Sequence, residues 1–127
     1  EAIKHYFGVE PVTFRNTELI YSDAIGKQVY DMGFKTILTE GARHIMGWRC
    51  PNYVYSNDFA SEQSLLLRNY VLSDDIAFRF GDRNWSGWPL TAEKFKGWID
   101  EAEGDYVGLC GMCRDHSSVL ILPCCCS

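Results

Sequence analysis

Glu18 is the acidic residue whose position is most informative. It lies in the segment FRNTELIY (14–21), toward the end of a stretch whose apolar residues suit a buried strand. In folds built from parallel strands, the carboxyl ends of the strands face the active site, so a carboxylate there can take part in catalysis. The alternative is a strand-end glutamate that forms an ion pair with Arg15 or Lys35. The pattern leaves both interpretations open.

Aromatic residues in loops form a second group of candidates, and aromatic residues make up 14% of the chain. Several lie in segments rich in Gly, Asn and Ser instead of recurring at helical spacing. Exposed rings can stack on the C–H faces of a sugar while nearby polar side chains bind its hydroxyls; alternatively, the rings cover the rim of the core. The candidate sugar-binding residues are Trp48, Arg49, Tyr53, Trp85 and Trp88, with Tyr55 close by.

Two further features have a simpler structural interpretation. Asp74 and Asp75 could be an acid/base pair, but with Ser73 before them they fit better as the cap of a helix N-terminus. His44 has no partner at the spacing of a metal site, so we interpret it as structural.

The cysteines are very unevenly placed. Cys50 is alone in residues 1–109, whereas the other five crowd into the last 18 residues. Cys110-x-x-Cys113-x-x-His116 could hold zinc or form a redox dithiol. However, the contiguous cysteines 124–126 are poorly placed to converge on one metal. We therefore predict neither a metal nor a cofactor, and we interpret the tail as foreign to the preceding fold.

Composition excludes several classes of protein. The 127 residues carry 12 Lys+Arg against 17 Asp+Glu, a formal charge of −5, which argues against nucleic acid as a partner. No run approaches the ~20 apolar residues that cross a bilayer, so we expect no membrane partner. The chain opens at Glu1 without a signal region, which favours the cytoplasm and a start within a domain. Oligomeric state cannot be predicted.

Periodicity and capping signals place the elements that would position these residues. They predict helices over 1–7, 24–32 and 91–103 and strands over 11–21, 34–41 and 105–110. Ser22 or Asp23 caps the second helix, and Thr91 caps the third. Residues 42–63 are predicted to be mostly loop, and 64–72 form a third apolar stretch. The alternation indicates an α/β fold with parallel strands under helices.

Several long blocks carry a resemblance to a known family. They are FRNTELIY (14–21), MGFKTILTEGA (32–42), GWRCPNYVYS (47–56), LLLRNYVLSDDIAFRF (65–80) and NWSGWPLTAEKFKGWI (84–99). From about residue 7 to residue 110 the chain resembles glycoside hydrolase family 57, in its α-amylase-like branch. The resemblance implies part of an incomplete seven-stranded parallel (β/α) barrel that acts on α-glucans, by hydrolysis or glucan transfer, with retention of configuration.

The resemblance also implies roles for residues. Glu18 matches the position of the family's nucleophile. Retention needs a second carboxyl group about 5–5.5 Å away, which protonates the leaving oxygen and later activates water. In the family this is the aspartate that opens an Asp-x-Glu-x-Phe-Gly motif, just after a strand that GDYVGL (104–109) resembles. Here GMCRDHSS follows instead, and Asp115 lacks the neighbours that would identify it.

We therefore divide the chain into a partial catalytic barrel, residues 1–110, and a Cys-rich tail, residues 111–127, which we expect to be disordered. A reading-frame error or a junction would explain the tail, and the other two frames of the nucleotide sequence test this. We expect a glycoside hydrolase fragment that binds α-glucan but is inactive by itself. The alternatives are a non-catalytic carbohydrate-binding relic and a Cys/His metal-binding module.

Overall fold

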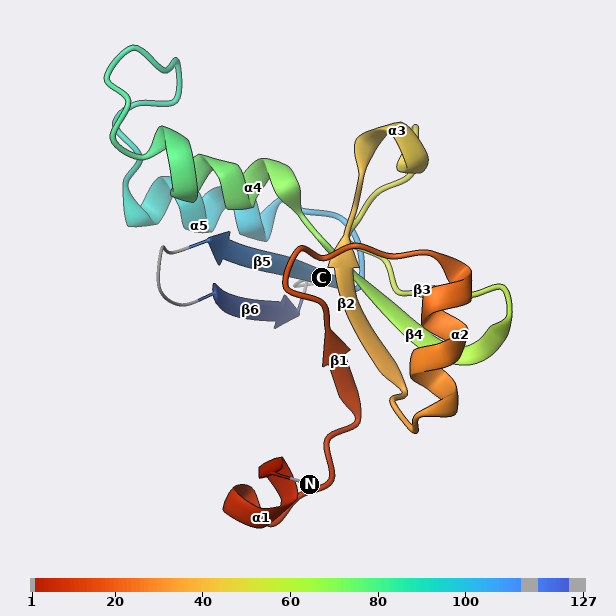
Figure 1. The fold of residues 1–127 in the computed structure, drawn as a ribbon. Coiled ribbons are helices and arrows are strands. Elements are labelled where there is room, and N and C mark those ends of the chain that lie inside the picture. The colour runs from red at the N-terminus through yellow and green to blue at the C-terminus, as the bar shows by residue number, and fades with distance from the viewer. Residues whose placement is uncertain (1, 113–116, 124–127) are drawn as a thin grey trace. The chain divides into compact units, whose positions relative to one another are not determined.

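The computed structural model describes residues 2–112 and 117–123, and the chain forms two compact units. Unit 1 comprises Glu1–Glu40 and Val54–Leu66, and unit 2 comprises Gly41–Tyr53 and Leu67–Ser127. Figure 1 shows the elements of both units along the chain.

Two helices belong to unit 1, and both confirm the sequence prediction. Helix α1 spans Ala2–Phe7 and α2 spans Asp23–Asp31. The hydroxyl of Ser22 accepts a hydrogen bond from the backbone N–H of Ile25 at 3.3 Å, so Ser22 is the N-cap of α2. Val29 lies on the buried face of this helix.

The sheet of unit 1 has the strand order β1-β2-β4-β3. These strands are β1 (Thr13–Arg15), β2 (Thr36–Glu40), β3 (Tyr55–Asn57) and β4 (Ala60–Arg68), the last two residues of β4 belonging to unit 2. Strands β1 and β2 are parallel, as predicted, with Thr13 opposite Thr36 and Arg15 opposite Leu38. Strand β1 is shorter than the predicted 11–21 because the chain turns after Arg15.

The β3–β4 pair differs from the predicted parallel arrangement, because it is antiparallel. Only Asp58 and Phe59 separate the two strands. A parallel pair needs a crossover of a dozen or more residues, so a two-residue connection leaves the hairpin as the available geometry. The Asn57 side-chain oxygen accepts hydrogen bonds from the backbone N–H groups of Phe59 (2.7 Å) and Ala60 (3.1 Å), which fixes the turn.

Residues 42–63 contain more regular structure than predicted. Helix α3 spans Arg43–Met46, and β3 and the start of β4 follow. The next apolar stretch is divided between strand β4 and helix α4 (Tyr70–Asp74). Asn69 makes the division, because its side chain accepts from the N–H of Leu72 at 3.1 Å and caps α4.

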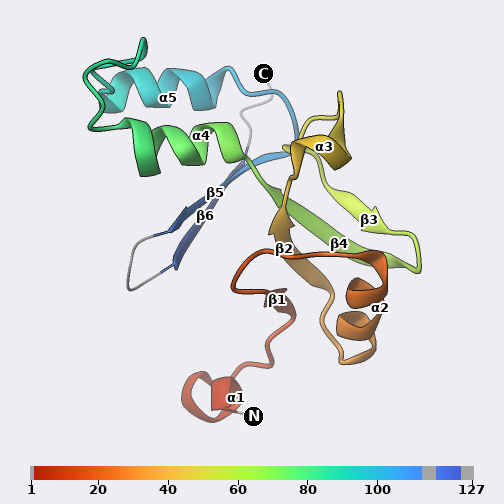
Figure 2. The same cartoon turned by 45° about the horizontal axis from the view of Figure 1, so that its top comes forward.

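Unit 2 is built around a pair of helices and a hairpin. Helix α4 continues as a π-helical segment η1 (Asp75–Arg79), and α5 spans Ala92–Asp100. Helices α4 and α5 lie side by side in both Figure 1 and Figure 2. The buried core of unit 2 consists of Leu72, Val107 and Leu109. The apolar face predicted for α5 packs against this core, and so does Leu122. The residues of that face are Phe95, Trp98, Ile99 and Ala102.

The hairpin pairs β5 (Tyr106–Met112) with β6 (Ser117–Pro123) in antiparallel register, from Tyr106 opposite Pro123 to Met112 opposite Ser117. The predicted disorder of the tail therefore does not describe residues 117–123. The apolar run VLIL (119–122) is too short to show a helical or strand period by itself, but its β-branched and aliphatic residues suit a strand that pairs with β5. Cys113, His116 and the three final cysteines lie outside the described residues.

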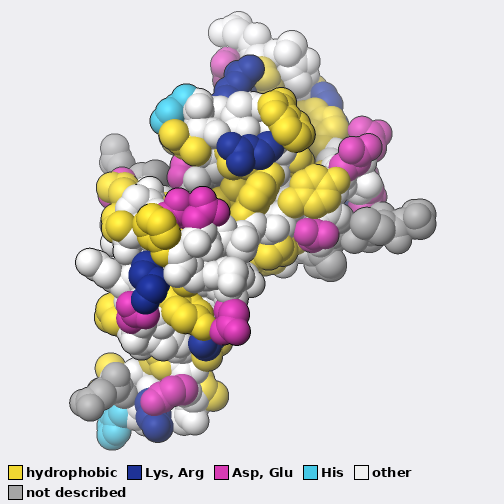
Figure 3. All heavy atoms as spheres, turned by 90° about the vertical axis from the view of Figure 1, so that its right-hand side faces the viewer, with side chains coloured by type: hydrophobic (Ala, Val, Ile, Leu, Met, Phe, Trp, Pro, Cys, Tyr) yellow, Lys and Arg dark blue, Asp and Glu magenta, His cyan; other side chains and the backbone are white. Residues whose placement is uncertain are grey.

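Much apolar surface is exposed. Phe78 (70% exposed) and Phe80 (61%) stand out near the end of η1, and Figure 3 shows hydrophobic side chains scattered among charged ones on one face. Within residues 2–112 and 117–123, none of the helices has the length and apolar character needed to cross a bilayer.

Candidate functional site

Glu18 lies on a tight turn just after β1, and it is exposed. Its backbone N–H donates to the side-chain oxygen of Asn16 at 2.9 Å, and the N–H of Leu19 donates to the Asn16 carbonyl at 3.0 Å. Leu19 has a φ of 56°, a left-handed conformation that is uncommon outside glycine. Such strained backbone is frequently found at functional sites.

The turn is anchored to the carboxyl end of β2. The carbonyl of Leu19 accepts from the Thr39 hydroxyl at 2.8 Å and from the Glu40 N–H at 3.1 Å. Leu19 and Thr39 are buried, whereas Glu18, which precedes Leu19 in the turn, is exposed. Because β1 and β2 are parallel, Glu18 lies at the shared carboxyl edge of these strands. Lys35, one of its predicted ion-pair partners, precedes β2 and donates to the Tyr30 hydroxyl at 3.2 Å.

A buried polar cluster that the sequence did not indicate lies farther along unit 1. Asn57 and Gln63 are almost completely buried, and the Asn57 amide donates to the Asp23 carbonyl at 3.0 Å and to Gln63 Oε1 at 3.3 Å. The hydroxyl of Tyr21 donates to Asp23 Oδ1 at 2.8 Å. Burial, together with this hydrogen bond to Asp23, raises the pKa of Tyr21 well above its usual value.

The first hollow of unit 2, which we call the strand-end hollow, has a volume of about 580 Å³. Its lining includes Gly41, which directly follows β2, and Asn69, which directly follows β4. The Asn69 side chain donates to Asn52 Oδ1 at 3.0 Å, and buried Asn52 in turn donates to the Glu103 carbonyl at 3.1 Å.

Arg49, a predicted sugar-binding residue, also lines the strand-end hollow. Its guanidinium group donates to the carbonyls of Met46 (3.2 Å) and Ile45 (3.1 Å), at the end of α3. These bonds hold Arg49 beside the hollow while leaving further N–H donors.

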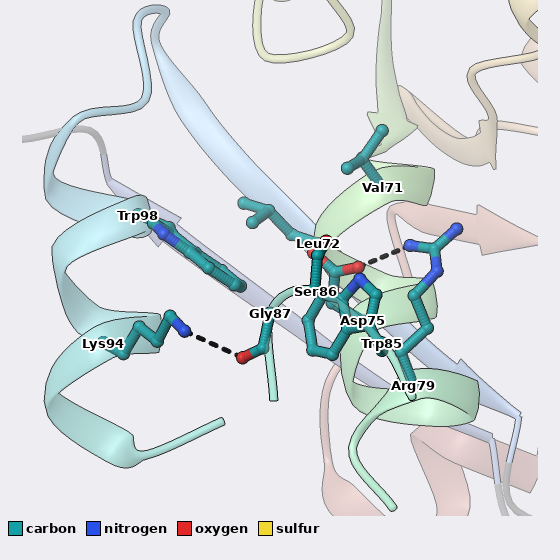
Figure 4. A pocket seen from close by; sticks show the side chains of 9 residues that line it. All are labelled: Val71, Leu72, Asp75, Arg79, Trp85, Ser86, Gly87, Lys94 and Trp98. Atoms are coloured by element: carbon teal, nitrogen blue, oxygen red, sulfur yellow. Dashed lines mark hydrogen bonds and ion pairs between the residues drawn. The ribbon is translucent and has the colours of Figure 1, made fainter. Parts of the chain in front are cut away.

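The second hollow of unit 2 lies between α4–η1 and α5, and we call it the inter-helix hollow (Figure 4). Its volume is about 570 Å³, and nine residues line it: Val71, Leu72, Asp75, Arg79, Trp85, Ser86, Gly87, Lys94 and Trp98. The predicted residue Trp85 is among them, with its ring 6.0 Å from that of Trp98 in an edge-on arrangement. The sequence placed Trp98 only on the apolar face of its helix, and nothing in the local pattern indicated this second position.

The remaining aromatic candidates belong to neither lining. Trp48 is 95% exposed, and Tyr53 and Trp88 are also exposed. The guanidinium of Arg83 lies 6.0 Å from the centre of the Trp88 ring. The structure thus brings Trp85 next to Trp98 in the inter-helix hollow. It places Arg49 in the lining of the strand-end hollow, together with Asn52 and Asn69. Trp48, Tyr53 and Trp88 stay on the surface of unit 2.

The predicted capping role of Asp74 and Asp75 is wrong. Helix α4 begins at Tyr70, so the two aspartates lie where α4 continues into η1, and the Asp74 side chain makes no capping hydrogen bond there. Asp74 forms an ion pair with Arg68, and Asp75 forms one with Arg79.

The described part of the chain holds no group of three or more His, Cys, Asp or Glu side chains that could bind a metal ion. Cys110 is buried, and His44 is exposed on α3. Most of the predicted Cys/His cluster lies outside the described residues.

Parallel strands with polar side chains just beyond their carboxyl ends define the class of α/β proteins whose sites form at that edge. The chain belongs to glycosyl hydrolase family 57, whose model matches residues 1–112. It is also 48% identical over 106 residues to a protein of Methanocaldococcus jannaschii described as "Putative alpha-amylase". That match covers 84% of this chain and 22% of the relative, so the chain spans about a fifth of the relative's length. No solved structure matches the chain.

Proposed function

We propose that this chain is part of a retaining glycoside hydrolase that acts on α-glucans, with Glu18 as its nucleophile. The observation that carries the proposal is the exposed Glu18 on a turn anchored at the carboxyl edge of β1 and β2. Its support is the family match over residues 1–112 and the name of the Methanocaldococcus relative.

In this reaction the Glu18 carboxylate attacks the anomeric carbon, and the bond from that carbon to the leaving oxygen breaks. A second carboxyl group gives its proton to the leaving oxygen. It then takes a proton from the water that hydrolyses the glycosyl ester, which restores Glu18. The bonds from Asn16 and Thr39 to the turn would hold the Glu18 backbone in place during attack.

The sequence lacks an Asp-x-Glu-x-Phe-Gly motif, so this 127-residue chain carries only the nucleophilic half of the pair. We divide the chain after residue 110, two residues before the end of the family match, with residues 111–127 as the divergent tail. We therefore expect that attack by the nucleophile can be tested separately from proton transfer by the acid.

An activated substrate tests the nucleophile without the acid. In 5-fluoro-α-glucosyl fluoride the leaving group is fluoride, which departs with the C–F bonding electrons and needs no proton. We expect mass spectrometry of the digested chain to find a glycosyl ester on the peptide that contains Glu18. Glu18→Gln should abolish the ester, whereas Glu10→Gln, which changes another exposed glutamate of unit 1, should not.

An ester on another carboxylate would show that Glu18 is not the nucleophile. Failure of labelling in a chain that still binds α-glucan would favour the non-catalytic carbohydrate-binding alternative.

A further inference from the structure

We propose that the inter-helix hollow of unit 2 is a binding subsite for a glucosyl unit of an α-glucan. The inference rests on the proposed α-glucan substrate, but the hollow lies entirely within unit 2 and does not involve Glu18. Its volume of about 570 Å³ falls in the roughly 300–1,000 Å³ range of small-molecule sites.

Two indole rings supply the apolar part of the hollow. Trp85 comes from the loop before α5 and Trp98 from α5 itself, and both are partly exposed (Figure 4). Their interplanar angle of 73° leaves them edge to face. The ring that presents its edge keeps its own faces clear of its partner, so one of those faces can receive the C–H face of a sugar.

Charged groups from η1 supply hydrogen-bond donors and acceptors to the hollow, on the side where Trp85 also lies (Figure 4). The Asp75 side chain is only 8% exposed and pairs with Arg79, whose side chain is 42% exposed. The ion pair holds the carboxylate in the wall, and the guanidinium group has five N–H donors, more than this pair uses. A vicinal pair of sugar hydroxyls can both accept from the guanidinium and donate to the carboxylate.

Lys94 completes the lining from the α5 side. Its ammonium group donates to the Gly87 carbonyl at 2.8 Å and lies 5.6 Å from the centre of the Trp98 ring. The first contact ties the loop that carries Trp85 to α5, and the ammonium group has two further donors. The hollow thus combines flat apolar rings with fixed polar groups, a composition that suits a carbohydrate better than an apolar ligand.

The hollow lies toward the carboxyl end of β5. The Asn69 N–H donates to the Gly108 carbonyl at 2.7 Å, and the Ser73 hydroxyl accepts from the Cys110 N–H at 3.2 Å. Helix α4 therefore advances in the same direction as β5, and Asp75, which follows Ser73, lies farther along. In the parallel (β/α) barrel that the family resemblance implies, that end of a strand is where a substrate is bound.

The test is a titration of the 127-residue chain with maltoheptaose, followed by intrinsic tryptophan fluorescence and calorimetry. Cellohexaose, which has the same sugar in β-linkage, is the control ligand. We expect saturable binding of maltoheptaose, and a loss of affinity of about tenfold or more in Trp85→Ala and in Lys94→Met. Lys96→Met is the matched control, because Lys96 lies on the same helix, is exposed and pairs with Asp100.

The proposal is overturned if maltoheptaose does not bind, if cellohexaose binds equally well, or if Trp85→Ala and Lys94→Met bind like the unmodified chain. Circular dichroism shows whether each variant keeps its fold, and Trp85→Ala removes a loop side chain without touching the Lys94–Gly87 bond. Glu10→Gln, at an exposed glutamate of unit 1, should keep full affinity. Failure of the unmodified chain to form the ester at Glu18 while it binds maltoheptaose would reject the nucleophile alone, and labelling without maltoheptaose binding would reject this subsite alone.

Discussion

Two glycines within helices differ sharply in what surrounds them. A Cβ added at Gly26 of α2 would lie 2.1 Å from Asn57 Nδ2 and 2.9 Å from Gln63 Oε1, both in the buried polar cluster. At Gly97 of α5 no heavy atom beyond its chain neighbours and the helix's own backbone lies within 4 Å of the added carbon. We expect Gly26→Ala to lower the free energy of unfolding by about 1–3 kcal/mol through overpacking.

Gly97→Ala is the matched control, and it should raise the free energy of unfolding by roughly 0.5–1 kcal/mol, since alanine favours the helix. Urea denaturation measures both. Equal effects of the two substitutions would contradict the close packing of α2 on Asn57.

Tyr21 gives a prediction about pH. Because its pKa in the folded chain lies above the usual value of about 10, the folded state keeps this proton longer than the unfolded state. The stabilisation is complete below about pH 10 and is lost as the pH rises toward the folded-state pKa. Between about pH 9 and about pH 11, stability should therefore fall less in Tyr21→Phe than in the unmodified chain.

Denaturant unfolding across this range measures the slopes. Tyr6→Phe, at a tyrosine that is 77% exposed, should follow the unmodified chain. Identical slopes in Tyr21→Phe and Tyr6→Phe would show that Tyr21 does not contribute.

Tyr106 of β5 is hydrogen-bonded to the end of β4 within unit 2. The side chain is buried, and its hydroxyl accepts from the Leu67 N–H and lies 3.1 Å from the Leu67 carbonyl and 3.2 Å from that of Pro51. Tyr106→Phe leaves the buried Leu67 N–H without this acceptor. We expect a loss of about 1–3 kcal/mol in the free energy of unfolding.

Thermal and urea unfolding test this substitution. Tyr53→Phe, which removes a hydroxyl from an exposed ring, should change stability little. A similarly small effect in Tyr106→Phe would mean that water replaces the lost acceptor.

The start of a helix could be predicted where a capping side chain marks it in the sequence. Helices α2 and α5 begin where Ser22 and Thr91 lie, because each hydroxyl binds an N–H three residues later in the same segment. The start of α4 could not be predicted, because Asn69, its cap, lies within the apolar stretch 64–72, in which the composition does not change from strand to helix. As a result, Asp74 and Asp75 were assigned to the wrong end of a helix.

The absence of an Asp-x-Glu-x-Phe-Gly motif from the 127 residues gives a prediction about activity, which rests on the proposed role of Glu18. General acid catalysis typically contributes about 10²–10⁴-fold to a rate, and the chain lacks the motif that would supply it. We therefore expect the 127-residue chain to release no measurable reducing sugar from soluble starch. Starch hydrolysis that disappears in Glu18→Gln would contradict this expectation.

The family, the capped and amphipathic helices α2 and α5, and a strand near Glu18 followed from the sequence alone, although the sequence predicted that this strand runs past Glu18 to residue 21 and it ends at Arg15. Each of these depends on residues that are neighbours in the chain or on long ordered blocks. Three features became visible in the folded chain: β3 runs antiparallel to β4, residues 117–123 pair with β5, and Trp85 meets Trp98 beside the Asp75–Arg79 pair. These features arise from contacts between segments whose pairing and packing no local periodicity encodes.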